Sequence, residues 1–124
     1  MLWTDGTPGL EILKGGSDSK KEEQQEQQWL PVPSVPNAFI CNVGDLIERW
    51  TNGVMKSTVH RVVSRGANER HSCAFFWEPD FDTLVTPLPK CVAENPPQRF
   101  EPTTYGAYIL ATYGATHAGF GEKK

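Results

Sequence analysis

The chain has 124 residues, of which 38% are hydrophobic and 22% are charged, and its formal net charge is −3. This length corresponds to one small domain with enough apolar residues for one core, and the acidic balance argues against a dedicated nucleic-acid binder. No apolar run approaches the ~20 residues of a membrane helix, and the start is too short and too polar for a secretory signal. We therefore expect a cytoplasmic protein whose partners include neither a nucleic acid nor a membrane.

Turn residues dominate the start of the chain, where Asp5-Gly6 and Pro8-Gly9 follow Met1 almost at once. A whole domain seldom begins with a turn, so we take this as a first sign of truncation. Residues 10–13 alternate enough to predict a short strand. Residues 15–28 are expected to form a flexible surface loop, because residues 17–28 include no apolar side chain. A short solvated helix or a glutamine-rich interaction segment is the alternative there.

The rest of the chain predicts several short strands and then one helix. In chain order we expect an edge strand at 29–33, a buried strand at 38–43, a helix at 46–50 capped by Asp45 and ended by Asn52-Gly53, strands at 57–63 and 70–77, an irregular proline-rich stretch at 86–97, a helix at 103–113 and a fraying tail at 119–124. This order suggests an antiparallel sandwich or barrel with an appended helix. The strands are too few to close a jelly roll, which needs about eight.

The three cysteines, Cys41, Cys73 and Cys91, are widely spaced and form no CxxC pair. This spacing predicts free, buried thiols and argues against structural disulfides or a zinc site. His71 and Cys73 share a strand face, but nothing else in the sequence completes a soft metal site around them. The aromatic residues Trp50, Phe75 and Phe76 are expected in the core.

A series of motifs runs through most of the chain. It reads DGTPGLE at 5–11, NVGDL at 42–46, RWTNG at 49–53, KSTVHRVV at 56–63 and RHSCAFF at 70–76. In this order the motifs resemble the isopenicillin N synthase-like branch of the iron(II)- and 2-oxoglutarate-dependent dioxygenases. The resemblance implies a mainly β fold, a partial double-stranded β-helix (jelly roll) with a C-terminal α-helix. Residues 1–100 would form the C-terminal half of that jelly roll, and residues 101–124 the C-terminal helix and tail.

The resemblance also implies roles for three side chains. His60 would be an iron ligand, and Arg70 and Ser72 would hold the distal carboxylate of 2-oxoglutarate. Imidazole suits iron(II), and two strand residues spaced two apart point to one face, where a guanidinium can pair a carboxylate. The ten-residue spacing from His60 to Arg70 allows a hairpin that places their strands side by side. Alone, a strand histidine or an Arg-x-Ser pattern would carry little weight, so these roles depend on the flanking motifs.

The iron site of such enzymes is a facial triad of two histidines and one carboxylate, and the resemblance places an His-x-Asp or His-x-Glu motif upstream. This chain has no such motif after any of its three histidines, and Asp5 lies in a turn and matches a non-ligand aspartate. The resemblance thus implies an oxidoreductase that uses iron(II), 2-oxoglutarate and dioxygen on a small organic substrate, by hydroxylation or desaturation. We expect this chain to be truncated, to be inactive and poorly stable alone, with no catalytic residue of its own, and to associate through exposed strand edges.

Two other interpretations remain. The chain could be a non-catalytic half-barrel that serves as a binding or regulatory module, for example by docking on a full-length relative through its open edge. It could also be a plain cupin-like fold that binds a small ligand without redox chemistry. In-frame coding sequence with an His-x-Asp motif upstream of Met1 would favour the dioxygenase, whereas a stop codon there and a stable folded product would favour the module.

Overall fold

The computed structural model describes residues 1–14, 28–64 and 69–117. The chain forms two compact units, and each is described by itself. The first unit comprises Met1–Glu48 and Met55–Phe76, and the second comprises Arg49–Val54 and Trp77–Lys124. The expected loop at 15–28 and the tail at 119–124 lie largely or wholly outside the described residues. None of the described helices is long and apolar enough to cross a bilayer.

The first unit contains a two-stranded antiparallel sheet, in which β1 (Leu2–Thr4) pairs with β5 (Ser72–Ala74). Trp3 is the direct partner of Cys73 in this register. Leu2 also makes an isolated antiparallel bridge with Ile40. The strand β1 was not expected from the sequence, because only four residues precede the first turn residues and its partner lies about 70 positions away.

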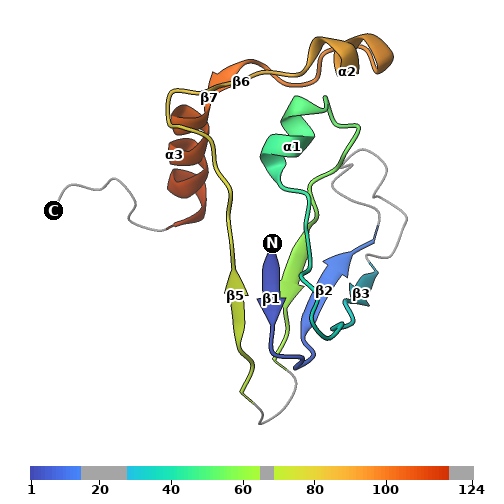
Figure 1. Ribbon diagram of the computed structural model, residues 1–124. Helices are drawn as coiled ribbons and strands as arrows, with labels where there is room; N and C mark the ends of the chain where they lie inside the picture. The colour runs from blue at the N-terminus through green and yellow to red at the C-terminus, as the bar shows by residue number, and fades with distance from the viewer. Residues whose placement is uncertain (15–27, 65–68, 118–124) are drawn as a thin grey trace, which may run out of the picture. The chain divides into compact units, whose positions relative to one another are not determined.

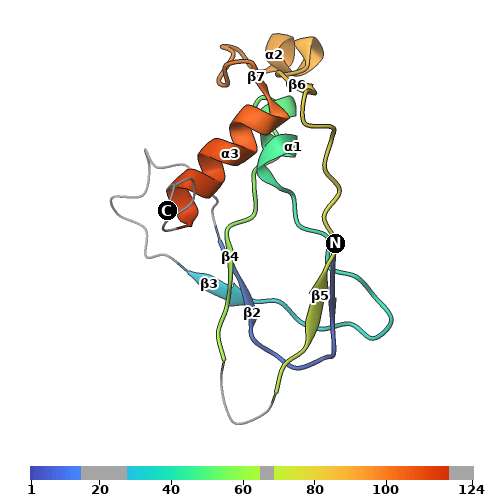
Figure 2. The ribbon, with the colours of Figure 1, turned by 90° about the vertical axis from the view of Figure 1, so that its left-hand side faces the viewer.

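The same unit contains a three-stranded antiparallel sheet in the order β3-β2-β4 (Figures 1 and 2). Its central strand β2 (Leu10–Leu13) lies between β3 (Trp29–Pro31) and β4 (His60–Val62). Pro31 is tolerated because β3 is at an edge, where a missing N–H removes no ladder bond. Leu10 is 3% exposed and belongs to the core of the unit.

The helix α1 (Asp45–Trp50) begins in the first unit with an acidic first turn that suits its positive end. It ends as expected, because Asn52 and Gly53 adopt positive φ angles of 51° and 79°. Asn52 belongs to the second unit and is fully buried. Its Nδ2 donates to the carbonyls of Asn95 and Pro97, and its Oδ1 accepts from the backbone N–H of Arg99.

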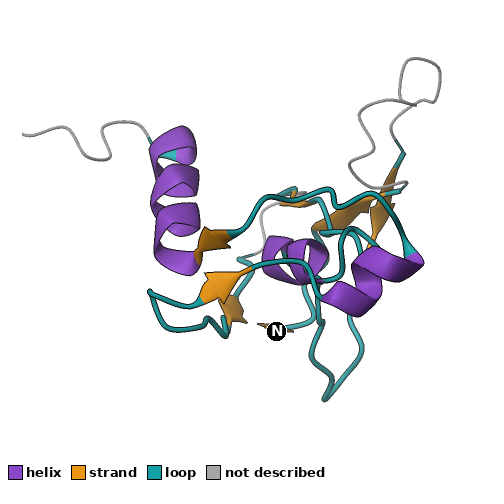
Figure 3. Ribbon diagram, turned by 90° about the horizontal axis from the view of Figure 1, so that it is seen from above, coloured by secondary structure: helices purple, strands orange, loops and turns teal. Residues whose placement is uncertain are grey.

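The second unit also holds a short antiparallel pair, β6 (Leu84–Val85) with β7 (Thr103–Thr104), next to α3 (Tyr105–Thr116) (Figure 3). Thr104 caps α3 by accepting a hydrogen bond from the backbone N–H of Ala107 at 3.2 Å. The ring of Phe81 packs so closely on Gly106 that any β-carbon there would overlap it. A hydrogen bond to the Glu78 carboxylate raises the pKa of Tyr105 to about 12.

Several sequence expectations are wrong. The stretch 38–43 is not a buried strand: Ile40 makes one bridge, and Phe39 is 65% exposed. The proline-rich stretch is not wholly irregular, because α2 (Pro89–Glu94) lies within it, with Pro89 in the first turn. The strands at 57–63 and 70–77 are only three residues each. Phe75 and Phe76 are exposed rather than core residues, and Cys41 and Cys73 are exposed rather than buried.

Candidate functional site

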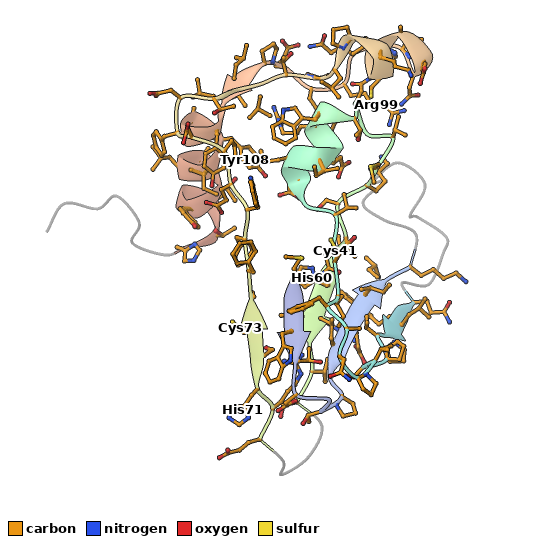
Figure 4. The ribbon with its side chains drawn as sticks, viewed as in Figure 1. Cys41, His60, His71, Cys73, Arg99 and Tyr108 are labelled. Carbon is orange, nitrogen blue, oxygen red and sulfur yellow. The ribbon has the colours of Figure 1, made fainter. Side chains whose placement is uncertain are left out.

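His60 is the first residue of β4 and lies directly opposite Ile12 of β2 (Figure 4). Its ring Nδ1 lies 2.8 Å from the backbone carbonyl oxygen of Thr58. A carbonyl can only accept, so Nδ1 carries the proton in this contact. In the neutral ring, Nε2 then presents its lone pair, which is the tautomer that a metal requires. His60 is exposed, so Nε2 is accessible to a ligand.

The register of the sheet assigns His60 to a face. Side chains alternate along a strand, so His60 and Val62 share one face with Leu10 and Ile12, their direct partners. The intervening Arg61 lies on the other face. The face that carries the candidate metal ligand is therefore lined by aliphatic side chains from the neighbouring strand.

Arg70 and Ser72 lie together at the start of β5, as their spacing predicted. Nη1 of Arg70 donates to Oγ of Ser72 at 3.1 Å. Nε of Arg70 is buried and has no hydrogen-bond partner among the described residues. A buried, unpaired N–H on a cation is costly, and a carboxylate is the group whose geometry suits a guanidinium edge. The arrangement can therefore accept a carboxylate ligand, although the binding role itself stays a prediction.

The expected hairpin between the strands of His60 and Arg70 is wrong. β4 pairs with β2 and β5 pairs with β1, so the two strands belong to different sheets of the unit (Figure 2). The sequence allowed a hairpin because residues 65–68 are polar. Instead, β5 pairs with β1 and β4 pairs with β2, and the turn between β1 and β2 separates these two partners.

Gly9, in that turn, links the two candidate groups. Its carbonyl accepts from the backbone N–H of Val63, the residue after β4, at 2.8 Å. A β-carbon on Gly9 would lie 2.8 Å from the Val63 carbonyl oxygen and 3.4 Å from Cδ of Arg70, and φ is +145°. Only glycine meets both requirements without strain. The sequence marked Pro8-Gly9 as a turn but gave no sign that it supports Arg70.

Asp5 stabilises the beginning of the same turn, next to β1, through hydrogen bonds. Its carboxylate accepts backbone N–H bonds from Thr7 at 2.8 Å and from His71 at 2.6 Å. These two bonds hold the pKa of Asp5 at about 2. The His71 ring lies 3.4 Å from the same carboxylate. Asp5 therefore connects β1 to the start of β5, beside Arg70, which agrees with its expected place in a turn.

Within residues 1–14, 28–64 and 69–117, no three His, Cys, Asp or Glu side chains gather into a metal-binding group. Figure 4 marks the separate positions of His60 on β4 and of His71 and Cys73 at β5. The described part of the chain thus offers His60 as a single candidate ligand.

Comparison with known proteins identifies the family. Residues 1–79 match the 2OG-Fe(II) oxygenase superfamily. The chain belongs to this superfamily. It is 36% identical over 113 residues to kihadalactone A synthase from Citrus sinensis, covering 91% of this chain and 31% of that protein. It is 33% identical to a homoarginine-6-hydroxylase from Arabidopsis thaliana, covering 83% of this chain and 33% of the relative.

Solved structures of the superfamily share the fold. The dioxygenase for auxin oxidation in rice aligns with a TM-score of 0.74 and 29% identity, over 93% of this chain and 36% of that one. The Neurospora crassa T7H protein in complex with alpha-KG and thymine aligns with a TM-score of 0.73 and 29% identity, over 94% and 34%. The predicted mainly β, partial jelly roll with a C-terminal helix is confirmed. This chain spans about a third of the length of these relatives.

Proposed function

We propose that this chain supplies one iron(II) ligand, His60, and the 2-oxoglutarate carboxylate site, Arg70 with Ser72, to a dioxygenase that acts on a small organic substrate with dioxygen. The observation that carries the proposal is the placement of Arg70 beside Ser72, where Nη1 of Arg70 donates to Oγ of Ser72 at 3.1 Å in an exposed position. Members of the superfamily use iron(II) and 2-oxoglutarate.

The residues present fit both groups. His60 donates through Nδ1 to Thr58, which leaves Nε2 for a metal, and such a backbone anchor is the usual support of a ligating imidazole. Arg70 can offer a carboxylate its guanidinium N–H groups, and the exposed Ser72 hydroxyl lies beside them. When bound, iron(II) with 2-oxoglutarate supplies the oxidising power for hydroxylation or desaturation of the substrate. The residues of this chain would bind and orient these groups.

The triad needs a second histidine and a carboxylate, and the described residues gather no such group around His60. We therefore propose that activity requires a polypeptide that carries the His-x-Asp motif, and that the chain by itself holds iron(II) weakly. The domain division at residue 100 and a cytoplasmic location remain part of the proposal. The alternative, a non-catalytic binding module, is favoured by that same lack of a gathered triad.

Binding of 2-oxoglutarate can be tested on the chain alone. The Nε–H signal of Arg70 in a ¹⁵N spectrum should shift on addition of 2-oxoglutarate, because that N–H gains an acceptor. Arg70→Met should weaken binding roughly 10- to 100-fold, the usual worth of hydrogen bonds to a charged group. Arg99→Met is the matched control, since it removes a guanidinium from the second unit (Figure 4). Equal binding by both variants would refute the assignment of Arg70.

Dioxygenase function can be tested in a chimera, in which this chain replaces the equivalent third of the rice auxin-oxidising dioxygenase. Anaerobic addition of iron(II) and 2-oxoglutarate should give the weak visible band of a chelated keto acid. The same addition to this chain alone should give none. A band in the chimera that is lost on His60→Ala supports the dioxygenase, and a folded chimera without the band favours the binding module.

A further inference from the structure

An ion pair between a buried carboxylate and a half-exposed arginine, stacked on an aromatic ring, lies on the face of the sheet opposite His60. Glu11 of β2 is only 5% exposed. Its Oε2 accepts from Nε of Arg61 at 2.9 Å and from Nη2 of Arg61 at 2.8 Å. The Arg61 guanidinium also lies over the ring of Trp29, with Cζ 4.0 Å from its centroid. Each of the three strands β2, β4 and β3 thus contributes one side chain.

The register places this cluster immediately behind the candidate ligand. Glu11 and Arg61 are direct cross-strand partners, and the next pair along the ladder is Ile12 with His60. Because alternate side chains point to opposite faces, the cluster and His60 occupy adjacent levels of the ladder on the two sides of the sheet. Any slip of β4 along β2 would therefore break the ion pair and at the same time displace His60.

The other contacts of β4 define its register only weakly. β4 has three residues, all exposed, and lies at the edge of its sheet. Val62, the apolar neighbour on the face of His60, is 57% exposed and defines the register poorly. A slip of one residue would turn His60 to the opposite face. Such an ion pair contributes little to stability compared with apolar packing, but it can penalise alternative pairings because they take the arginine away from the buried Glu11 carboxylate.

We infer that Glu11 is a positioning residue for His60: it fixes the register of β4 through Arg61, which Trp29 holds from its other side. This inference rests on the proposed function in one respect: the proposed iron-binding role of His60 is the reason why its side chain must lie on one particular face of the sheet. Glu11 and Arg61 lie on the opposite face of the sheet from His60 and act on it through the strand.

The test compares hydrogen exchange at three backbone amides in the metal-free chain and in Glu11→Gln, a variant of the same shape without the charge. Leu13 and Val63 donate across the β2–β4 ladder, to Val59 and Gly9, whereas Val32 donates to Leu10 on the β3 side. If Glu11 fixes the register of β4, its loss should lower protection from hydrogen exchange at Leu13 and Val63 about tenfold more than at Val32. Hydrogen exchange reports local opening at each amide separately. General destabilisation would lower all three alike.

A matched control is Lys56→Gln, which breaks the 3.8 Å Lys56–Glu48 ion pair of the same unit, and neither of these residues pairs in the β2–β4 ladder. This variant should leave the relative protection from hydrogen exchange at the three amides unchanged. If Glu11→Gln does not fold, Arg61→Lys keeps the charge but loses the two-pronged contact, and it should give the same selective pattern at smaller size. Equal changes at the three amides, or none, in the folded variant would overturn the inference.

Manganese(II) separates this inference from the proposed function. In the parent chain, Mn²⁺ should selectively broaden the imidazole signals of His60, and in Glu11→Gln that broadening should fall several-fold. If Mn²⁺ leaves His60 of the parent unaffected, the metal role is wrong while the exchange result still decides the register. If broadening is unaltered in a variant with lost β4 protection, His60 does not depend on Glu11 and the positioning role is wrong.

Discussion

Arg70 donates from Nη1 to the exposed hydroxyl of Ser72, whereas its own Nε is shielded from solvent and has no partner among the described residues. The serine thus orients the guanidinium and leaves one edge donor free. An exposed Nε–H would bond to water, but a shielded one cannot. In the proposed function the pair binds the distal carboxylate of 2-oxoglutarate, which has the charge and geometry that suit a guanidinium.

Ser72→Ala should weaken 2-oxoglutarate binding by about five- to tenfold, the worth of one hydrogen bond, because Arg70 loses its orienting contact. The midpoint of thermal unfolding should change little, since Ser72 is exposed. Titration calorimetry and a thermal melt measure the two effects separately. Ser72→Thr keeps the hydroxyl and should restore most of the affinity, and a failure of this rescue would argue that size alone governs the site.

Gly9→Ala should destabilise the chain by about 1–3 kcal/mol, the cost of a strained backbone position, and should also reduce 2-oxoglutarate binding. The added β-carbon would meet the Val63 carbonyl oxygen at 2.8 Å and press on Cδ of Arg70. Gly44→Ala is the control, because a β-carbon there meets nothing within 4 Å. Urea unfolding of the two variants gives the comparison, and similar losses in both would contradict the role of Gly9.

Local signals in the sequence predicted the local structure. The strand at Leu10–Leu13 was recognised from its alternation between turn residues, and it was found at those residues. The helix expected at 103–113 is present at Tyr105–Thr116, because its cap and apolar stripe are encoded within a few positions. The stretch at 38–43 has a strand composition but lacks a continuous partner, and strand pairing is decided by residues far away in sequence.

Only those parts of the candidate site that are formed by residues close together in the sequence could be predicted. Arg70 and Ser72 are two positions apart, so strand alternation was enough to bring them together. The contact of Gly9 with Arg70 and the pair of Glu11 with Arg61 join residues about 50 to 60 positions apart. A sequence gives no distance across such a span, and the strand order β3-β2-β4 had to be known first.

Asn52→Ala should destabilise the second unit by roughly 2–4 kcal/mol, because a fully buried side chain and its hydrogen bonds to three backbone groups are lost. The carbonyls of Asn95 and Pro97 and the N–H of Arg99 all bond to this side chain. Alanine is also disfavoured at a φ of 51°. Asn37→Ala is the control, since Asn37 has a similar φ of 58° but is exposed. Equal effects in urea unfolding would mean that backbone strain, not the hydrogen bonds, accounts for the loss.

Asp5 should make the stability of the first unit depend on pH in acid. Its pKa in the folded chain is about 2, below its ordinary value of 3.8, because the ionised carboxylate accepts the backbone N–H groups of Thr7 and His71. A depressed pKa means that the stabilisation is complete above pH 3.8 and is lost as the pH falls toward 2. Asp5→Asn should be less stable than the parent at pH 6, and the difference should narrow between pH 4 and pH 2. Urea unfolding at pH 6, 4, 3 and 2 measures this, and a difference that stays constant would show that the charge of Asp5 does not stabilise the turn.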